Sequence, residues 1–376
     1  MKDLLSWIGS LPPLAQIPVV VGLFLAVAFV VVLLIEVAPR PGRRFTIIRF
    51  AACVVIPAVV FLLLGSVWWA VSAAVVLGAL FFLLDYRSRQ GKGYLFALMG
   101  FLAPAIVLLL IGLVYPSIQT ILLSFQSNRG SWIGFDNFVW IFTQPGNLVV
   151  IRNTIIWVLV VPVFSTALGL AYAVFIDKSR GEKYLKILVF MPMAISFVGA
   201  SIIWRFVYAY RPDGSDQIGV LNGLVTLFGG EPVNWLQQVP LNSFLLMVVL
   251  IWVQTGFAMV ILSAAIKGVP VEQLEAAQLD GTNAWQRFRN VTVPAIRPSI
   301  IVVLTTISIA SLKVFDIVRT MGLAYPDTGV IANEMVTLLQ KFEAGRSAAF
   351  AVVLFLLVMP IVIYNARQIQ KTRELR

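Results

Sequence analysis

Long apolar runs alternate with short polar gaps along most of this chain. The runs reach about 18 residues or more, the length at which an α-helix crosses roughly 30 Å of hydrocarbon. Backbone groups in lipid must pair within their own segment, and the runs lack the alternation of barrel strands, so the pattern predicts helices. The predicted fold is therefore an all-α polytopic membrane protein. Nine transmembrane helices are expected, near residues 14–36, 47–64, 66–84, 95–117, 153–176, 187–208, 241–264, 299–318 and 347–365.

The polar gaps divide the chain into two parts. Residues 1–94 hold three expected helices joined by short loops, and residues 95–376 hold a core of six. The second and third runs are separated only by Gly65 and Ser66, so a tight hairpin and a re-entrant pair are both open for them. The first run is too long for a signal peptide and lacks a basic start, and we expect it to be retained.

Composition agrees with a membrane location. Sixty per cent of the residues are apolar, twelve per cent are charged, and the mean hydropathy is +0.94. A soluble domain carries about a quarter charged residues. The chain has one cysteine, Cys53, and no histidine, which excludes an internal disulfide and the usual Cys/His metal sites. A membrane-embedded enzyme is disfavoured for the same reason.

The net charge of +11 follows a topological pattern rather than that of a nucleic-acid-binding protein. Most basic residues lie in alternate gaps, which the positive-inside rule places in the cytoplasm. The C-terminus is then expected inside and the N-terminus outside. The basic residues in these gaps are Arg40, Arg43, Arg44, Arg49, Arg87, Arg89, Lys92, Lys178, Arg180, Lys183, Lys186, Lys267, Arg287, Arg289, Arg297, Arg367, Lys371, Arg373 and Arg376.

A hydrophilic island separates the seventh and eighth apolar runs. Its first half predicts a short helix from Val271 to Asp280. Pro270 suits the first turn of a helix, and acids such as Glu275 suit the positive end of the helix dipole. Gly281 follows where a helix can end in the left-handed conformation open to glycine.

The second half of the island predicts another short helix, from Asn283 to Asn290, with Thr282 as its cap. Trp285 and Phe288 share one face of it, and Pro294 marks re-entry into the next span. Two short helices with small alanines, an acid and exposed aromatics suit a groove in another protein. An amphipathic pair lying on the bilayer surface is the alternative.

The pattern of the island is E-A-A, three residues, G, nine residues, then aliphatic-x-aliphatic-P. It resembles the signature cytoplasmic loop, here residues 265–298, of the permeases of binding-protein-dependent ABC importers. The resemblance implies that this loop contacts an ATPase. The residues to which it assigns that contact are Glu275, Ala276, Ala277, Asp280, Gly281 and Pro294.

The flanking segments resemble the carbohydrate-uptake class of these permeases, which is maltose- and α-glucoside-like. The similarity covers most of residues 95–376, and the ending, including Ile331–Met335, leans toward the α-glucoside branch. One departure is Gly322–Asp327, which replaces a glycine-rich segment. Further matching segments are Trp252–Phe257, Trp285–Phe288, Leu312–Asp316 and Arg152–Thr154.

The resemblance implies one of two unlike permease subunits of an ATP-driven sugar importer in the bacterial inner membrane. Two cytoplasmic ATPase subunits would hold ATP and Mg²⁺, and an external solute-binding protein would deliver a di- or oligosaccharide. This chain is then expected to be no enzyme, to hold no cofactor or metal and to bind no nucleic acid. Independently of the resemblance, it contains no G-x-x-x-x-G-K-[ST] phosphate loop.

A sugar pathway needs hydrogen-bonding groups and aromatic surfaces at membrane depth. Polar side chains within a span usually face a cavity or the protein interior. Helix packing, bonding of hydroxyls to their own backbone and an ion pair between Lys313 and Asp316 are the alternatives. The candidates on the seventh span are Trp252, Gln254, Thr255 and Phe257, and those on the eighth are Thr305, Ser308, Lys313 and Asp316.

Two further alternatives stay open. An ion-coupled secondary transporter of small solutes would show buried acids near the midplane, of which Asp316 is the clearest here. The aromatic residues of the polar loops 118–150, 209–240 and 319–346 suit either the membrane interface or a docking surface for a partner protein.

Overall fold

The described residues are helical apart from turns, loops and one isolated bridge between Gln126 and Trp132. In this computed structural model they are residues 47, 50–55, 75, 79, 102, 105–106, 109–177, 179–212, 215–322 and 327–374. Backbone contacts divide the chain into two units, Met1–Ser117 and Ile118–Arg376. The first three expected spans lie almost wholly outside the described residues, and so does the expected domain boundary at residue 94. The expected number of nine transmembrane helices therefore stays a prediction.

The unit Met1–Ser117 contributes two described π-helical turns, η1 (Ala51–Val55) and η2 (Leu110–Val114). Helix α7 (Tyr115–Leu123) continues directly from η2. Together they extend the fourth expected span to Leu123, six residues beyond its predicted end at 117.

Four stretches of the described chain are helices long and apolar enough to cross a membrane. They confirm the fifth, seventh, eighth and ninth expected spans. They are α9 (Pro145–Ile176), α13 (Leu241–Lys267), the continuous helix Ala284–Leu312, and Ala344–Tyr364 within α18 (Ala344–Glu374).

The sixth expected span, 187–208, is wrong as one straight helix. The chain forms α10 (Glu182–Phe190), the 3₁₀ turn η3 (Met191–Ala194) and α11 (Phe197–Val207), and the helical pair is bent by 104°. Pro192 supplies no backbone N–H for a continuing helix. Ser196 then takes an extended conformation and caps α11, because its hydroxyl accepts a hydrogen bond from the Gly199 N–H at 3.1 Å.

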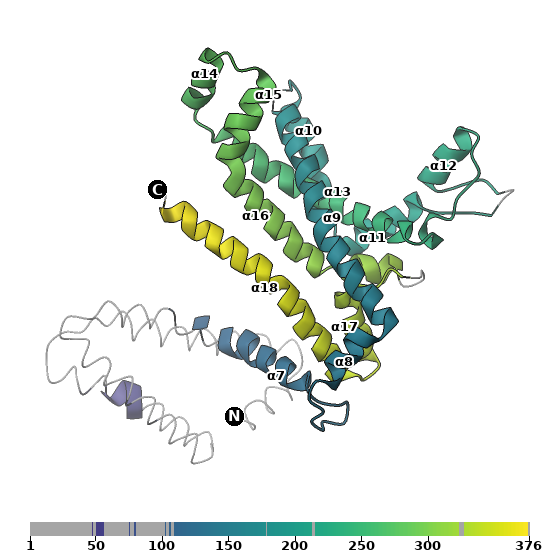
Figure 1. Ribbon diagram of the computed structural model, residues 1–376, viewed down its shortest axis with the longest axis vertical. Coiled ribbons are helices and arrows are strands. Elements are labelled where there is room, and N and C mark those ends of the chain that lie inside the picture. The colour runs from purple at the N-terminus through teal and green to yellow at the C-terminus, as the bar shows by residue number, and fades with distance from the viewer. Residues whose placement is uncertain are drawn as a thin grey trace. The chain divides into compact units, whose positions relative to one another are not determined.

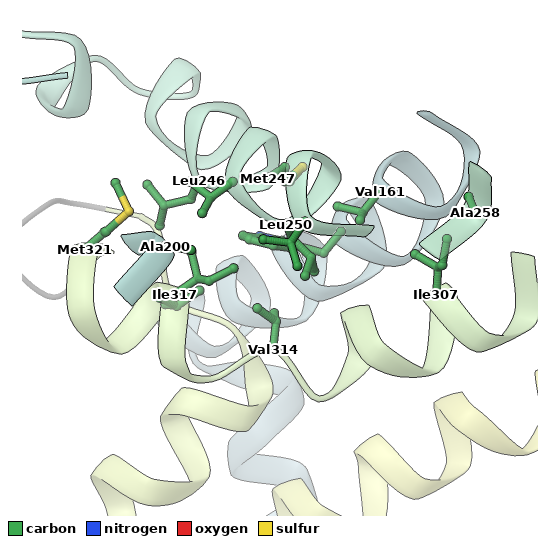
Figure 2. Packing of buried hydrophobic residues seen from close by; sticks show 14 of the residues in the cluster. Val161, Ala200, Leu246, Met247, Leu250, Ala258, Ile307, Val314, Ile317 and Met321 are labelled. Carbon is green, nitrogen blue, oxygen red and sulfur yellow. The ribbon is translucent and has the colours of Figure 1, made fainter. Parts of the chain in front are cut away.

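The centre of the second unit is the contact of α9 with α13, against which α16 (Val293–Leu312) also packs (Figure 1). Figure 2 shows Val161 of α9, Leu250 of α13 and Ile307 of α16 within the same buried cluster. A Cβ on Gly169 would lie 2.5 Å from the Ala258 Cβ. Only glycine allows the two helices to approach this closely.

A smaller cluster joins α8 (Asp136–Thr143), α17 (Ile331–Gln340) and α18 through residues such as Ile141 and Phe350. The short helix α12 (Val220–Leu227) and the turns η4 (Trp235–Gln237) and η6 (Val318–Gly322) complete the loops between spans. Helices α10, α14 and α15 gather at the other end of the bundle from α8 and α17 (Figure 1).

The Arg152–Thr154 motif at the start of the fifth span has a structural task. The Asn153 side-chain amide donates to the carbonyl oxygens of Asp327 and Gly329 at 2.6 and 3.1 Å, and the Ile331 N–H donates to the Thr154 hydroxyl at 3.0 Å. These bonds tie α9 to the segment that leads into α17. The motif thus satisfies backbone groups of a partly buried connection.

Candidate coupling segment and solute pathway

The hydrophilic island folds as α14 (Val271–Leu279), α15 (Ala284–Arg287) and the π-helical turn η5 (Phe288–Thr292). We call residues 271–292 the α14–η5 segment. The predicted first helix is confirmed, with Pro270 before it and Asp280 after it.

Gly281 ends α14 in the way its sequence position predicts. Its φ is +78°, in the left-handed region. The Gly281 N–H donates to the Gln278 carbonyl at 3.1 Å and the Thr282 N–H to the Ala277 carbonyl at 3.2 Å. This pair of bonds is a Schellman motif, which satisfies carbonyls at the end of a helix.

The expected capping role of Thr282 is wrong. Its hydroxyl donates to the Ala277 carbonyl at 2.6 Å, so it closes α14 instead of opening α15. Asn283 caps α15: its side chain accepts from the Gln286 N–H at 2.8 Å, and the Gln286 side chain accepts from the Asn283 N–H at 2.9 Å. This reciprocal capping box fixes the direction in which α15 leaves the turn.

The predicted second short helix is not a separate element. α15 continues through η5 into α16 without a break, and the three form one helix over Ala284–Leu312. Pro294 lies at the start of α16, where its missing N–H is tolerated because the preceding π-helical turn changes the hydrogen-bond register. Pro294 therefore marks an entry to the span without ending the helix before it.

The α14–η5 segment leaves most of its side chains uncovered. Ala277 and Thr292 are its buried residues, while Glu275, Ala276 and Asp280 are exposed. Both polar and apolar groups are presented: Leu279 is 89% exposed and Trp285 66% exposed. α14 carries polar residues on several sides, which argues against its lying flat on a bilayer and favours a groove in a protein.

The candidate pathway residues on α13 differ in whether their side chains already have partners within the protein. The Thr255 hydroxyl is buried and donates to the Ile251 carbonyl of its own helix at 2.7 Å, and Phe257 packs against the main core. The Gln254 side chain is half-buried, and no hydrogen bond to it is formed within the described chain. Among the described residues its amide thus differs from the Thr255 hydroxyl, which has a partner in its own helix.

Trp252 contacts an aromatic residue that the sequence did not single out. Its ring lies 5.8 Å from that of Trp204 on α11, edge to face, and both indoles are half-buried. Trp204 in turn lies 5.3 Å from the ring of Tyr208. The spacing of four residues between Trp204 and Tyr208 was a usable signal for an aromatic face on the sixth span.

The candidates around α16 lie on two different elements. The hydroxyls of Thr305 and Ser308 donate to the Ile301 and Leu304 carbonyls, each at 2.8 Å. α16 ends at Leu312, so Lys313 and Asp316 lie beyond the helix that carries the hydroxyls.

Lys313 is exposed and Asp316 half-buried. The expected alternative of an ion pair between them is not observed, although both residues are described. In the ranges that the structure describes, no cluster of three or more His, Cys, Asp or Glu could hold a metal ion.

Comparisons with known proteins agree with this geometry. Residues 149–374 match the family described as the inner membrane component of binding-protein-dependent transport systems. The chain is 46% identical over 278 residues to the osmoprotective compounds uptake permease protein GgtC of Synechocystis sp., covering 73% of this chain and 100% of that protein. It is 48% identical over 277 residues to the alpha-glucoside transport system permease protein AglF of Rhizobium meliloti, covering 73% and 82%.

A solved structure has the same fold. A chain of the bacterial alginate ABC transporter, crystallised with its alginate pentasaccharide-bound periplasmic protein, superimposes with a TM-score of 0.63 at 24% identity. The match covers 75% of this chain and 95% of that chain. The expected helical permease fold is thereby confirmed, and this chain belongs to the family of inner membrane components of binding-protein-dependent transport systems.

Proposed function

We propose that this chain is the transmembrane subunit of an ATP-driven sugar importer and forms half of its translocation pathway. The observation that carries this proposal is the α14–η5 segment, whose backbone is fixed by its own caps while its side chains remain uncovered. A rigid, exposed and partly apolar projection suits a groove in a partner protein. That partner is a cytoplasmic ATPase, which holds the ATP and Mg²⁺ that this chain does not bind.

The assembly contains a second permease subunit, two ATPase subunits and an external solute-binding protein. The α14–η5 segment and the C-terminus of the chain lie in the cytoplasm, in agreement with the distribution of basic residues. Closure of the ATPase pair then moves α14, and the spans pass between inward- and outward-facing states. The residues that contact the ATPase are Glu275, Ala276, Ala277, Asp280, Gly281 and Pro294.

The substrate is a di- or oligosaccharide such as an α-glucoside. The 48% identity to a permease named for alpha-glucoside transport supports this class. The 46% identity to a permease for osmoprotective compounds supports a second candidate, an osmoprotective solute. Binding of a panel of both solute classes to the external protein would distinguish them.

The solute pathway runs past α13 and the end of α16. Gln254, Lys313 and Asp316 supply polar groups to the solute, and Trp252 supplies an aromatic surface. Thr255, Thr305 and Ser308 retain a carbonyl partner in their own helix, so they can only accept a further hydrogen bond. Phe257 supports the wall of the pathway from the core side.

Gly281→Asp tests the coupling role. The substitution places a side chain in a left-handed conformation and adds a second acid beside Asp280, in a surface that an ATPase should cover. We expect uptake and solute-stimulated ATP hydrolysis to fall by about tenfold or more, because an uncompensated interface charge costs several kcal/mol. Both are measured in proteoliposomes containing the complex purified with its partner subunits.

The matched control is Gly281→Ala. Open space surrounds the Gly281 Cβ position, so alanine adds only backbone strain, on the order of 1 kcal/mol. Normal stimulated hydrolysis and uptake in Gly281→Asp would refute the coupling role. Uptake that needs an ion gradient and no ATPase subunit would support the ion-coupled alternative.

Gln254→Leu tests the pathway. Removing the amide should reduce sugar uptake by about tenfold, since a lost hydrogen bond within a buried site is worth roughly 1 to 2 kcal/mol. Basal ATP hydrolysis should remain unchanged, because the α14–η5 segment is untouched. Val260→Leu, on an exposed part of the same helix, is the control. Unchanged uptake in Gln254→Leu would remove Gln254 from the pathway.

A further inference from the structure

A network of charged and polar side chains joins α9, α10 and α13 close to the point where the chain leaves α13 for α14. Asp177 directly follows α9, Glu182 and Lys186 belong to α10, and Ser263 and Lys267 belong to α13. The Lys186 ammonium lies 2.5 Å from an Asp177 carboxylate oxygen and 2.8 Å from one of Glu182. A second ammonium, that of Lys267, lies 2.5 Å from the same Glu182 oxygen.

Ser263 closes the network at its buried side. Its hydroxyl donates to Asp177 at 2.8 Å and accepts from the Lys186 ammonium at 2.6 Å. The side chains of Asp177 and Lys186 are only 12% and 24% exposed. Poorly solvated charges are stable only while they remain paired, so the network opposes any separation of these helix ends.

The far end of α10 is also held against α13. A Cβ on Gly256 would lie 2.6 Å from the Val189 carbonyl oxygen and 3.0 Å from the Phe190 Cα. The backbones therefore touch at this level, two turns along α13 from Ser263. α10 and α13 are therefore a pair of helices joined at two levels.

This pair lies between α14 and the bend of the sixth span. Only Gly268, Val269 and Pro270 separate Lys267 from α14, and Val269 is buried. At its other end α10 meets η3 and the 104° bend into α11. A continuous path thus leads from α14 along the chain to α13, through the network to α10, and on to the bend.

We propose that Lys186 is a positioning residue for transport, because it makes α10 follow the movement of α13 and α14. The inference rests on the proposed function, since it takes α14 as the element that the ATPase moves. Lys186 contacts neither solute nor nucleotide in this scheme. Its loss should weaken the link between hydrolysis and transport. Asp177 then keeps only the Lys267 ammonium as an ion-pair partner, at 3.9 Å, while Glu182 stays paired with Lys267. The ATPase still moves α14, but α10 transmits less of the movement to α11.

The test measures sugar molecules taken up per ATP hydrolysed by the complete transporter in proteoliposomes. Lys186→Met should lower this ratio by about fivefold or more, the lower range of coupling between distant sites. Lys186→Arg keeps the charge and should retain most of the ratio. Lys183→Met is the matched control on the same helix, because Lys183 is exposed and forms no ion pair with any described residue.

Asp177→Asn and the double variant Asp177→Asn with Lys186→Met provide a second measurement. If the network acts as a unit, the double variant should be no worse than Lys186→Met alone. If Lys186→Met prevents assembly, Ser263→Ala removes only the bridging hydroxyl and should lower the ratio in the same direction.

Gly281→Asp in the same assay distinguishes the two proposals. If it abolishes stimulated hydrolysis while Lys186→Met and Ser263→Ala leave the ratio unchanged, the positioning role is refuted and the proposed function stands. If Gly281→Asp has no effect, the proposed function fails first. An equal drop of the ratio in Lys183→Met and Lys186→Met would also overturn the inference, since it would reflect loss of charge alone.

Discussion

In the α14–η5 segment the backbone is fixed by bonds to its own neighbours, whereas the contact of α9 with α13 is fixed by side chains distant in sequence. The segment buries little beyond Ala277 and Thr292, and its turn is held by the Schellman motif and the capping box. At the α9 contact, Gly169 lies directly against Ala258. The α14–η5 segment thus keeps its conformation while its side chains stay exposed. The contact between α9 and α13 keeps its geometry because the facing residues are buried against each other.

This difference predicts which amino-acid substitutions each region tolerates. A side chain on the α14–η5 segment can change without disturbing its conformation, provided that the caps remain. A residue between α9 and α13 cannot grow without moving a helix, because packed interiors leave few voids. Substitutions in the first region should therefore alter function at constant assembly, and substitutions in the second should alter assembly itself.

The largest effect is expected from Gly169→Val. The new Cβ would lie 2.5 Å from the Ala258 Cβ and 2.8 Å from the Met259 backbone nitrogen, so α9 and α13 must separate. Overpacking of this kind costs roughly 1 to 3 kcal/mol. Thermal unfolding of the purified complex measures the loss. Gly146→Val, on the same helix but facing open space, is the control, and equal destabilisation by both would contradict the packing argument.

A smaller effect is expected from Asn283→Ala, which removes one half of the capping box. Loss of such a cap costs about 1 kcal/mol and should loosen α15 while the bundle stays assembled. Hydrogen exchange at the Gln286 amide should accelerate, and uptake should fall modestly. Gln273→Ala on exposed α14 serves as the control. A lowered yield of assembled complex would show that the segment is not structurally independent.

The smallest effect is expected at Glu334 on α17. Its side chain is half-buried, so its exposure lies between that of the α14–η5 segment and that of the α9–α13 contact. Burial raises the pKa of its carboxyl above the usual range, although Lys341 opposes this and Glu343 adds to it. A raised folded pKa means that stability falls as pH rises from the unfolded pKa through the folded one. Glu334→Gln should therefore raise the melting temperature slightly at neutral pH, with no gain at acidic pH.

Glu343→Gln is the control for this comparison. The Glu343 carboxylate lies 2.7 Å from the Arg346 guanidinium, so its removal loses an ion pair and should not stabilise the protein. A gain for Glu334→Gln that is independent of pH would mean that the burial of its charge is not the cause.

The sequence predicted the segment with local signals and missed what depends on distant contacts. Pro270 and Gly281 bound α14 as expected, because caps and left-handed glycines are decided within a few residues. Asn283 followed by Gln286 is a capping-box pattern, so the sequence does contain the signal for the cap of α15. Thr282, the adjacent polar residue predicted for that role, closes α14 instead.

Hydropathy could predict the existence of the spans but not their course. The run 187–208 is predominantly apolar, and Pro192 is the residue in it that breaks a straight helix before the 104° bend. Likewise, polarity alone could not show that the Thr255 hydroxyl bonds to its own helix, whereas the Gln254 amide has no hydrogen-bond partner among the described residues. The Trp204 contact with Trp252 depends on how two distant helices pack, which no local pattern encodes.

The unbroken helix Ala284–Leu312 has a mechanical consequence. Its 29 residues make a rod about 43 Å long at about 1.5 Å per residue. A tilt of about 10° at the α15 end would displace Leu312 by about 7.5 Å, more than one helical pitch of about 5.4 Å. Such a rod acts as a lever, because a small rotation at α15 produces a large lateral displacement of the other helix end, next to Lys313.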